Sequence, residues 1–207
     1  MSRLSVTRVM DYLTERELLE GWYLKNGEAK RKKIQDEALR VGSLVDSLIQ
    51  QDIREGGYLV PEGDTPVVNC LKGWEKFKKD CPMFIETVKE MQIELKDGEL
   101  IGHPDFVIDD GMRKGIIDLK CARSIQPRYW TQTAQYLKMN GGGNFIGVLR
   151  LEKTDENGLY EYQENNDLEY IKYEWKVFEA YLTAYHHNKN NREAIRKMLE
   201  DNYEGVK

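Results

Sequence analysis

The sequence predicts a mixed α/β fold, in which a sheet containing both parallel and antiparallel strands is flanked by helices. Three observations predict it. Apolar residues recur with a helical period across 34–53, and the period changes to two between 88 and 121. A helical segment at 127–140 is then followed by an apolar strand at 144–152. Helices before, between and after the strands can cover both faces of one sheet.

The segments before the sheet are expected to be helical. LSVTRVMDYL (4–13) is consistent with a short helix or with an entry strand and turn. The periodic segment 34–53 predicts a longer amphipathic helix, and the Gly- and Pro-containing segment 54–66 predicts a loop. A second amphipathic helix is expected over 69–80, and it ends before Pro82 because the residue preceding a proline disfavours helical geometry.

The period of two predicts three antiparallel strands. The first is expected over 88–96, and the Asp-Gly pair at 97–98 is a hairpin signal. The second strand is expected over 99–109. A second Asp-Gly pair, at 110–111, leads into a third strand over 115–121.

The C-terminal part of the chain returns to alternating elements. Pro127 is suited to the first turn of a helix that runs to about Asn140, where GGG at 141–143 stops it. Strands are expected at 144–152 and 158–163, and two helices over 167–203. A core-facing stripe marks the first of these two helices: Ile171, Trp175, Phe178, Leu182 and Tyr185.

The 207 residues fit a single domain spanning 1–207, with its motifs between 38 and 151. No apolar run is long enough for a transmembrane helix, and the N-terminus lacks the features of a signal peptide. Three widely spaced cysteines, Cys70, Cys81 and Cys121, form no CxxC pair. These features favour a reduced, cytoplasmic protein without disulfides.

The net charge of −5 by itself argues against a nucleic-acid partner, but the charge is unevenly distributed. Residues 152–174 carry a net charge of −6, so the rest of the chain is slightly basic. Within that remainder, 25–33 is net +4 and 72–79 is net +3. Each basic run is either a nucleic-acid contact or a solvated helix face.

The stretch GHPDFVIDDGMRKGIIDLKCA (102–122) places three charged residues among apolar ones: Asp105, Asp118 and Lys120. Asp118 and Lys120 are two residues apart, so they share one face of a strand. A hairpin folded symmetrically about Gly111 and Met112 puts Asp105 opposite Asp118, with Cβ atoms about 4.5–5.5 Å apart. A divalent cation relieves the repulsion between two such carboxylates, and hard oxygen ligands suit Mg²⁺ or Mn²⁺. The alternative is an ion-paired cluster at a strand end.

GHPDFVID…GIIDLKCA resembles the core motif of the PD-(D/E)xK nuclease superfamily, with Asp105 and the run Asp118-Leu119-Lys120 matching it residue for residue. QTAQY, with Gln132 and Tyr136 four residues apart, resembles the QxxxY motif of RecB-like and phage (lambda-type) exonuclease-like members. RVGSLVDSLI resembles the G-x-x-x-H motif of the same branch, with Asp46 in place of the histidine.

The resemblance implies a restriction-endonuclease-like core and a metal-dependent nuclease. Asp105, Asp118 and the Leu119 carbonyl would hold Mg²⁺ or Mn²⁺, and Asp46 would stand where the family has a histidine ligand. Lys120 would act on the attacking water or on the phosphate. Gln132 and Tyr136 would contact DNA near the scissile phosphate or support the site.

DNA is the partner that the resemblance implies, and phosphate contacts would make binding sensitive to salt but not to sequence. The candidates for these contacts are Lys30, Arg31, Lys32, Lys33, Arg40, Arg123 and Arg128. We expect a DNA exonuclease of phage or prophage recombination or repair, with a recombination protein or a second copy of the chain as a possible partner. The alternatives are a structure-specific endonuclease, a catalytically degenerate binding module on the same fold, and a structural protein that uses 152–174 as its partner surface.

Overall fold

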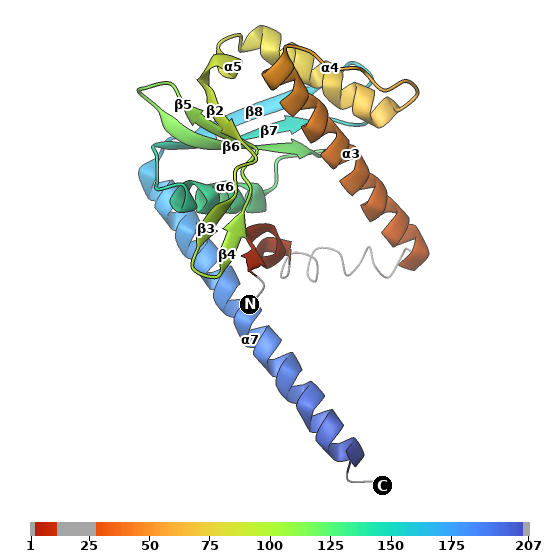
Figure 1. The fold of residues 1–207 in the computed structure, drawn as a ribbon, viewed down its shortest axis with the longest axis vertical. Helices are drawn as coiled ribbons and strands as arrows, with labels where there is room; N and C mark the ends of the chain where they lie inside the picture. The colour runs from red at the N-terminus through yellow and green to blue at the C-terminus, as the bar shows by residue number, and fades with distance from the viewer. Residues whose placement is uncertain (1–2, 12–27, 205–207) are drawn as a thin grey trace.

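The main sheet has five strands, and β6 lies at its centre (Figure 1). The computed structural model describes residues 3–11 and 28–204, and the side chains among them except those at 28, 29, 31 and 191–204. The sheet contains β2 (Val88–Met91), β5 (Phe106–Asp109), β6 (Lys114–Cys121), β7 (Phe145–Leu151) and β8 (Tyr160–Asn165), in the order β2-β5-β6-β7-β8. β2, β5 and β6 are antiparallel, β7 is parallel to β6, and β8 is antiparallel to β7. The mixed α/β fold class is confirmed.

Helices cover both faces of this sheet (Figure 1). One face is covered by α3 (Glu28–Glu55) and α4 (Thr65–Asp80), with the short α5 (Phe84–Thr87) beside them. The other face is covered by α6 (Pro127–Met139) and α7 (Leu168–Glu204). The predicted helices at 34–53 and 69–80 are present, and each begins earlier than predicted. For α4 the reason is Pro66, which lies in its first turn, where a missing N–H costs nothing.

The central strand is buried on both faces, which explains its nearly continuous apolar sequence. Ile117 and Leu119 belong to the core beneath α3 and α4, whereas Ile116 belongs to the core beneath α6 and α7. Burying each such side chain contributes about 1.5–3 kcal/mol. The sheet therefore fixes β6, and with it the charged residues at its C-terminal end.

A second, three-stranded sheet lies beside the first. It contains β1 (Leu4–Ser5), β3 (Leu95–Asp97) and β4 (Leu100–Gly102), in the order β1-β4-β3. β3 and β4 form the hairpin predicted at 97–98, and β1 pairs with β4 in parallel. Residues 6–11 are helical and follow β1 directly, so both alternatives for LSVTRVMDYL hold in part.

Two of the predicted strands are wrong in length, because each is split between the two sheets. The strand predicted over 88–96 is β2 and β3, separated at Gln92, whose φ of 51° interrupts extended geometry. The strand predicted over 99–109 is β4 and β5, separated by His103-Pro104-Asp105. Pro104 has no N–H for a sheet ladder, and its carbonyl accepts instead from the Gln92 N–H at 3.0 Å.

The prediction of two helices over 167–203 is also wrong, since α7 is one continuous helix whose C-terminal part extends away from the sheets (Figure 1). Its predicted stripe does face the core. The predicted stop after α6 is confirmed: Gly141 and Gly142 have φ of 82° and 88°, and the Gly142 N–H donates to the Leu137 carbonyl at 2.9 Å.

Gly102 ends β4 against the ring of Tyr136. A Cβ atom at Gly102 would lie 2.6 Å from Tyr136 Cε1, which is too close for any side chain. We predict that Gly102→Ala lowers the free energy of unfolding by about 1–3 kcal/mol, because Tyr136 is buried and has no room to move. Urea denaturation measures this change.

Gly42→Ala is the matched control. Nothing lies within 4 Å of a Cβ atom at Gly42, which is inside α3, so alanine should stabilise the protein by up to about 1 kcal/mol through helix propensity. Equal effects of the two substitutions would show that the Tyr136 ring does not restrict Gly102.

Candidate active site

The β5–β6 hairpin brings its acidic residues together. Its register pairs Phe106 with Ile117 and Val107 with Ile116, as the symmetric turn predicted. Asp105 and Asp118 are the next residues beyond the last pair. Asp105 Oδ2 accepts the Leu119 N–H at 2.6 Å, so its carboxyl group reaches the backbone directly after Asp118.

Asp118 and Lys120 form an ion pair at the end of β6. Asp118 Oδ2 lies 2.5 Å from Lys120 Nζ, and the side chain of Asp118 is only 2% exposed. Burial opposes the charge on Lys120, yet the carboxylates of Asp118 and Asp105 raise the pKa of Lys120 above its ordinary value. Without a cation these carboxylates thus favour the ammonium form of Lys120, which can stabilise negative charge beside it.

Asp46 reaches the same place from α3. Its Oδ2 accepts from Gln92 Nε2 at 3.2 Å, and the same nitrogen donates to Asp105 Oδ1 at 2.7 Å. The other oxygen, Asp46 Oδ1, is buried and has no hydrogen-bond partner. Burial, and then the charge of Asp118, raise the pKa of Asp105 well above its usual range, and burial likewise raises the pKa of Asp46.

Gln92 was not predicted as a site residue. It lies in a segment whose alternating pattern predicts an ordinary strand. The sequence therefore indicates neither its left-handed backbone conformation nor the direction of its side chain. The structure shows that it joins α3 to the hairpin through two carboxylates.

Gln132 and Tyr136 lie one turn apart on α6, and both side chains are buried. Gln132 Nε2 donates to Tyr136 Oη at 2.9 Å and to Thr7 Oγ1 at 3.2 Å. Burial, and then the charge of Asp118, raise the pKa of Tyr136, so its phenol stays neutral. Thr7, from the helical residues 6–11, is a second contributor that sequence reasoning missed, because 125 residues separate it from Gln132.

A hollow of about 320 Å³ opens between α3 and the end of β6. The residues lining it include Leu39, Gly42, Asp46, Asp105, Leu119 and Lys120. Thus the structure brings the predicted acidic residues, Leu119 and Lys120 to one place. Neither Gln132 nor Tyr136 lines this hollow, although burial, and then the charge of Asp118, raise the pKa of Tyr136.

A divalent cation fits these residues in part. Within the ranges that the structure describes, no three His, Cys, Asp or Glu side chains are grouped closely enough to hold a metal ion. Mg²⁺, however, commonly uses only one or two carboxylates and completes its shell with water and substrate phosphate. Asp46 and Asp105 share one donor, and Asp46 Oδ1 is buried without a partner, as expected of oxygens that bind a cation.

The predicted DNA contacts fall into two groups. The side chains of Lys30, Lys32, Lys33 and Arg123 are exposed, while that of Arg31 lies outside the described residues. Arg40 and Arg128 are already engaged. Arg40 pairs with Asp64 at 2.6 Å and with Glu37, and Arg128 pairs with Asp11 at 3.1 Å.

A second hollow, of about 310 Å³, lies elsewhere on the sheet and offers no comparable chemistry. It is lined by Phe77, Phe84 and Tyr162 among other apolar residues. The charged side chains that line it, Arg113 and Glu164, are paired with each other at 3.1 Å. The acidic hollow beside β6 is therefore the candidate active site.

No protein-family model matches the sequence, and no curated protein matches it. Among solved structures, SSO0001 is 13% identical, with 86% of this chain and 75% of that one covered and a TM-score of 0.41. The alkaline exonuclease LHK-Exo from Laribacter hongkongensis is 15% identical, with 93% of both chains covered and a TM-score of 0.37, and its complex with dAMP gives the same values. Similarity at this level establishes neither a family nor an activity for this chain.

The raised pKa of Asp105 makes stability depend on pH when no cation is present. A carboxyl group whose pKa is higher in the folded state stabilises the fold below its ordinary pKa, and this stabilisation is lost as the pH rises through the raised pKa. We predict that in EDTA the Asp105→Asn variant loses less unfolding free energy than the wild type between pH 4 and pH 8. Urea denaturation across this range tests it.

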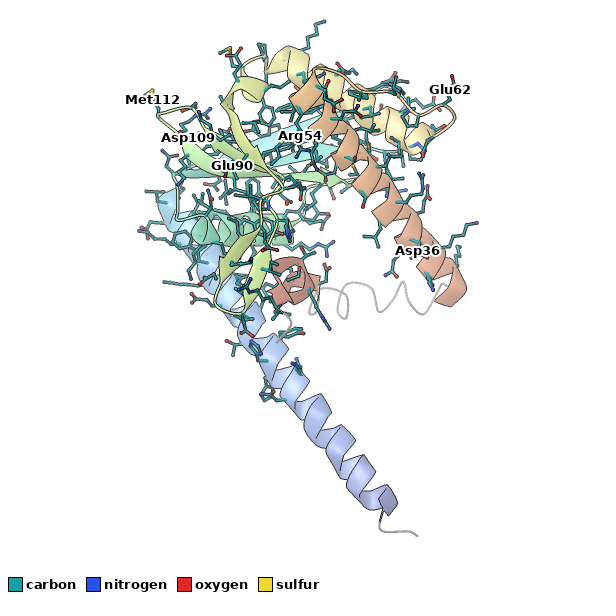
Figure 2. All side chains as sticks on the ribbon, viewed as in Figure 1. Asp36, Arg54, Glu62, Glu90, Asp109 and Met112 are labelled. Carbon is teal, nitrogen blue, oxygen red and sulfur yellow. The ribbon has the colours of Figure 1, made fainter. Side chains whose placement is uncertain are left out.

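Asp36→Asn serves as the control, because Asp36 is exposed on the projecting half of α3 (Figure 2). Its pH profile should follow that of the wild type. If the Asp105→Asn profile also ran parallel to that of the wild type, burial would not destabilise the charged form of Asp105 in the folded protein.

Proposed function

We propose that this protein is a nuclease that hydrolyses phosphodiester bonds of DNA with the help of Mg²⁺ or Mn²⁺. One observation carries the proposal: Asp46, Asp105 and Lys120 line one hollow, and the buried Asp118 is ion-paired to that lysine. A cation held by carboxylates can acidify a bound water and neutralise charge on a phosphodiester, and an ammonium beside it adds to that neutralisation. Among the residues that the structure describes, none of the helices has the length and apolarity that a membrane span requires.

Each residue has a distinct part in this proposal. Asp46, Asp105 and Asp118, with the Leu119 carbonyl, would hold the cation, which when bound supplies an acidified water and neutralises phosphate charge. Asp105 is positioned for this role by the Leu119 N–H. Lys120 would bind the phosphate or act on the attacking water. Gln132 and Tyr136 support the site with neutral donors.

The basic half of α3 supplies a route for DNA. The first turns of this helix project beyond the sheet, as Figure 1 shows, and Figure 2 places Asp36 on this projecting part. One hollow there is lined by three basic residues, Lys32, Lys33 and Arg40, together with Asp36 and Glu37. It is close in sequence to Leu39, which lines the acidic hollow. DNA phosphates on these lysines would lead the strand toward Lys120.

The finer proposal is an exonuclease that acts on linear DNA, in phage or prophage recombination or repair. It follows from the resemblance of Gln132 and Tyr136 to the QxxxY motif. The second candidate is a DNA-binding module with a degenerate site. It is favoured by the absence of a three-acid group among the described residues and by Asp46 at the histidine position.

Cleavage of labelled linear and closed circular DNA, with Mg²⁺, with Mn²⁺ and with EDTA, tests the proposal. We predict metal-dependent degradation of the linear substrate, its abolition in Asp118→Ala, and a rate at least about 100-fold lower in Lys120→Ala, because one charge-stabilising group typically contributes this much. Cleavage of the circle would identify an endonuclease.

Lys138→Ala is the matched control. This lysine lies on α6 and pairs with Glu179 of α7, away from the hollow, so its loss should leave the cleavage rate within about twofold. DNA binding that depends on salt, without cleavage in either metal, would replace the nuclease with the binding module.

The route along α3 gives a separate prediction. Replacing both Lys32 and Lys33 with alanine should weaken DNA binding and reduce the slope of log affinity against log salt by about 2, one for each lost phosphate contact. Fluorescence anisotropy in EDTA at several salt concentrations measures the slope. Lys172→Ala on α7 is the control, and an unchanged slope in the double variant would place DNA elsewhere.

A further inference from the structure

Gln92 has the only left-handed backbone among the non-glycine residues that the structure describes. Its φ is 51°, a conformation that side chains with a Cβ atom adopt at a cost. Such outliers cluster at sites where the surrounding structure enforces them for function. The enforcing contacts are visible here: the Gln92 N–H donates to the Pro104 carbonyl at 3.0 Å, next to Asp105.

This backbone directs the amide of Gln92 between two carboxyl groups. Nε2 donates to Asp105 Oδ1 at 2.7 Å and to Asp46 Oδ2 at 3.2 Å. An amide oxygen facing two carboxylates would be repelled, so the nitrogen must face them when no cation is present. A neutral donor, however, does not neutralise two negative charges, and Asp46 Oδ1 remains buried without a partner.

We propose that Gln92 is a further protein ligand of the divalent cation, beside the carboxyl groups of the proposed function. Its amide nitrogen holds Asp46 and Asp105 together in the cation-free state, and its oxygen Oε1 turns to the cation when one binds. The inference rests on the cation of the proposed function but not on DNA hydrolysis.

The chemistry of the site favours this role. Amide oxygens are hard ligands that accept Mg²⁺ and Mn²⁺, as carboxylates do. Among the described residues no three His, Cys, Asp or Glu side chains are grouped closely enough to hold a metal ion, and Asp118 is paired with Lys120, so a neutral oxygen ligand would add to an incomplete set. Gln92 already contacts both acids, and rotation about its terminal bond exchanges nitrogen for oxygen without moving the backbone.

Binding of Mn²⁺ alone to the full chain, measured by calorimetry without DNA, tests the inference. In Gln92→Met, which keeps the length and loses the oxygen ligand, affinity should fall by about tenfold or more. In Gln92→Glu, whose carboxylate is a stronger ligand, it should rise. Gln92→Asn suits the left-handed backbone and shortens the reach, so it should stay folded and also bind at least about tenfold more weakly.

Gln51→Met is the matched control. Gln51 is on the same helix as Asp46, and its Nε2 donates to Glu55 Oε2 at 2.9 Å instead of to a carboxyl group of the site. Its loss leaves Asp46, Asp105 and Gln92 with their hydrogen bonds, so affinity for Mn²⁺ should stay within about twofold. Thermal melting in EDTA verifies that every variant is folded.

Two results overturn the inference. Affinity that is unchanged or higher in both Gln92→Met and Gln92→Asn means that the amide only fastens the carboxyl groups together, and no Mn²⁺ binding by the wild type removes the ligand role altogether. If the wild type cleaves DNA and the Gln92 variants bind Mn²⁺ with unchanged affinity, only this inference is contradicted. If Mn²⁺ affinity changes as expected but no cleavage occurs, only the proposed nuclease activity is contradicted.

Discussion

The crowding of negative charge at the end of β6 is the constraint on which the rest of the site depends. Asp105 and Asp118 are placed there by the hairpin, and Asp46 is added by α3. Three carboxyl groups in one partly buried region repel each other. The protein offsets this with the Lys120 ammonium, the Leu119 N–H and the Gln92 amide. Of these three groups only the Lys120 ammonium carries a positive charge, so the negative charge of the carboxyl groups is not fully neutralised.

The apolar sheet is what makes that arrangement tolerable. β6 is packed on both faces, and its neighbours β5 and β7 are also largely buried. The stability gained by burying this sheet between two layers of helices compensates for the repulsion within the acidic cluster. This is expected of functional sites, which trade stability for chemistry. The cluster lies at the C-terminal end of β6, where the strand is no longer covered on both faces. The side chain of Lys120 therefore remains partly exposed to solvent.

The N-terminal residues connect the two sheets to the site. β1 pairs with β4, and Thr7 directly after it accepts a hydrogen bond from Gln132. Arg128, at the start of the same helix α6, pairs with Asp11. The centroid of the Tyr129 ring lies 5.4 Å from Lys120 Nζ and 5.4 Å from Arg128 Cζ. Lys120 and the Arg128–Asp11 ion pair therefore adjoin the same aromatic ring. Thr7 and Asp11, both from the segment 3–11, thus contact α6.

The sequence by itself determined the fold class, the hairpin register and the convergence of Asp105, Asp118 and Lys120. These follow from local rules: the period of two, the Asp-Gly turn and the spacing of two residues along a strand. Only the tertiary structure decided that two predicted strands divide between sheets, that Gln92 reaches Asp46 and Asp105, and that Thr7 and Asp11 contact α6. The reason is that a left-handed residue and contacts across more than 100 residues depend on packing between elements, which no local pattern records.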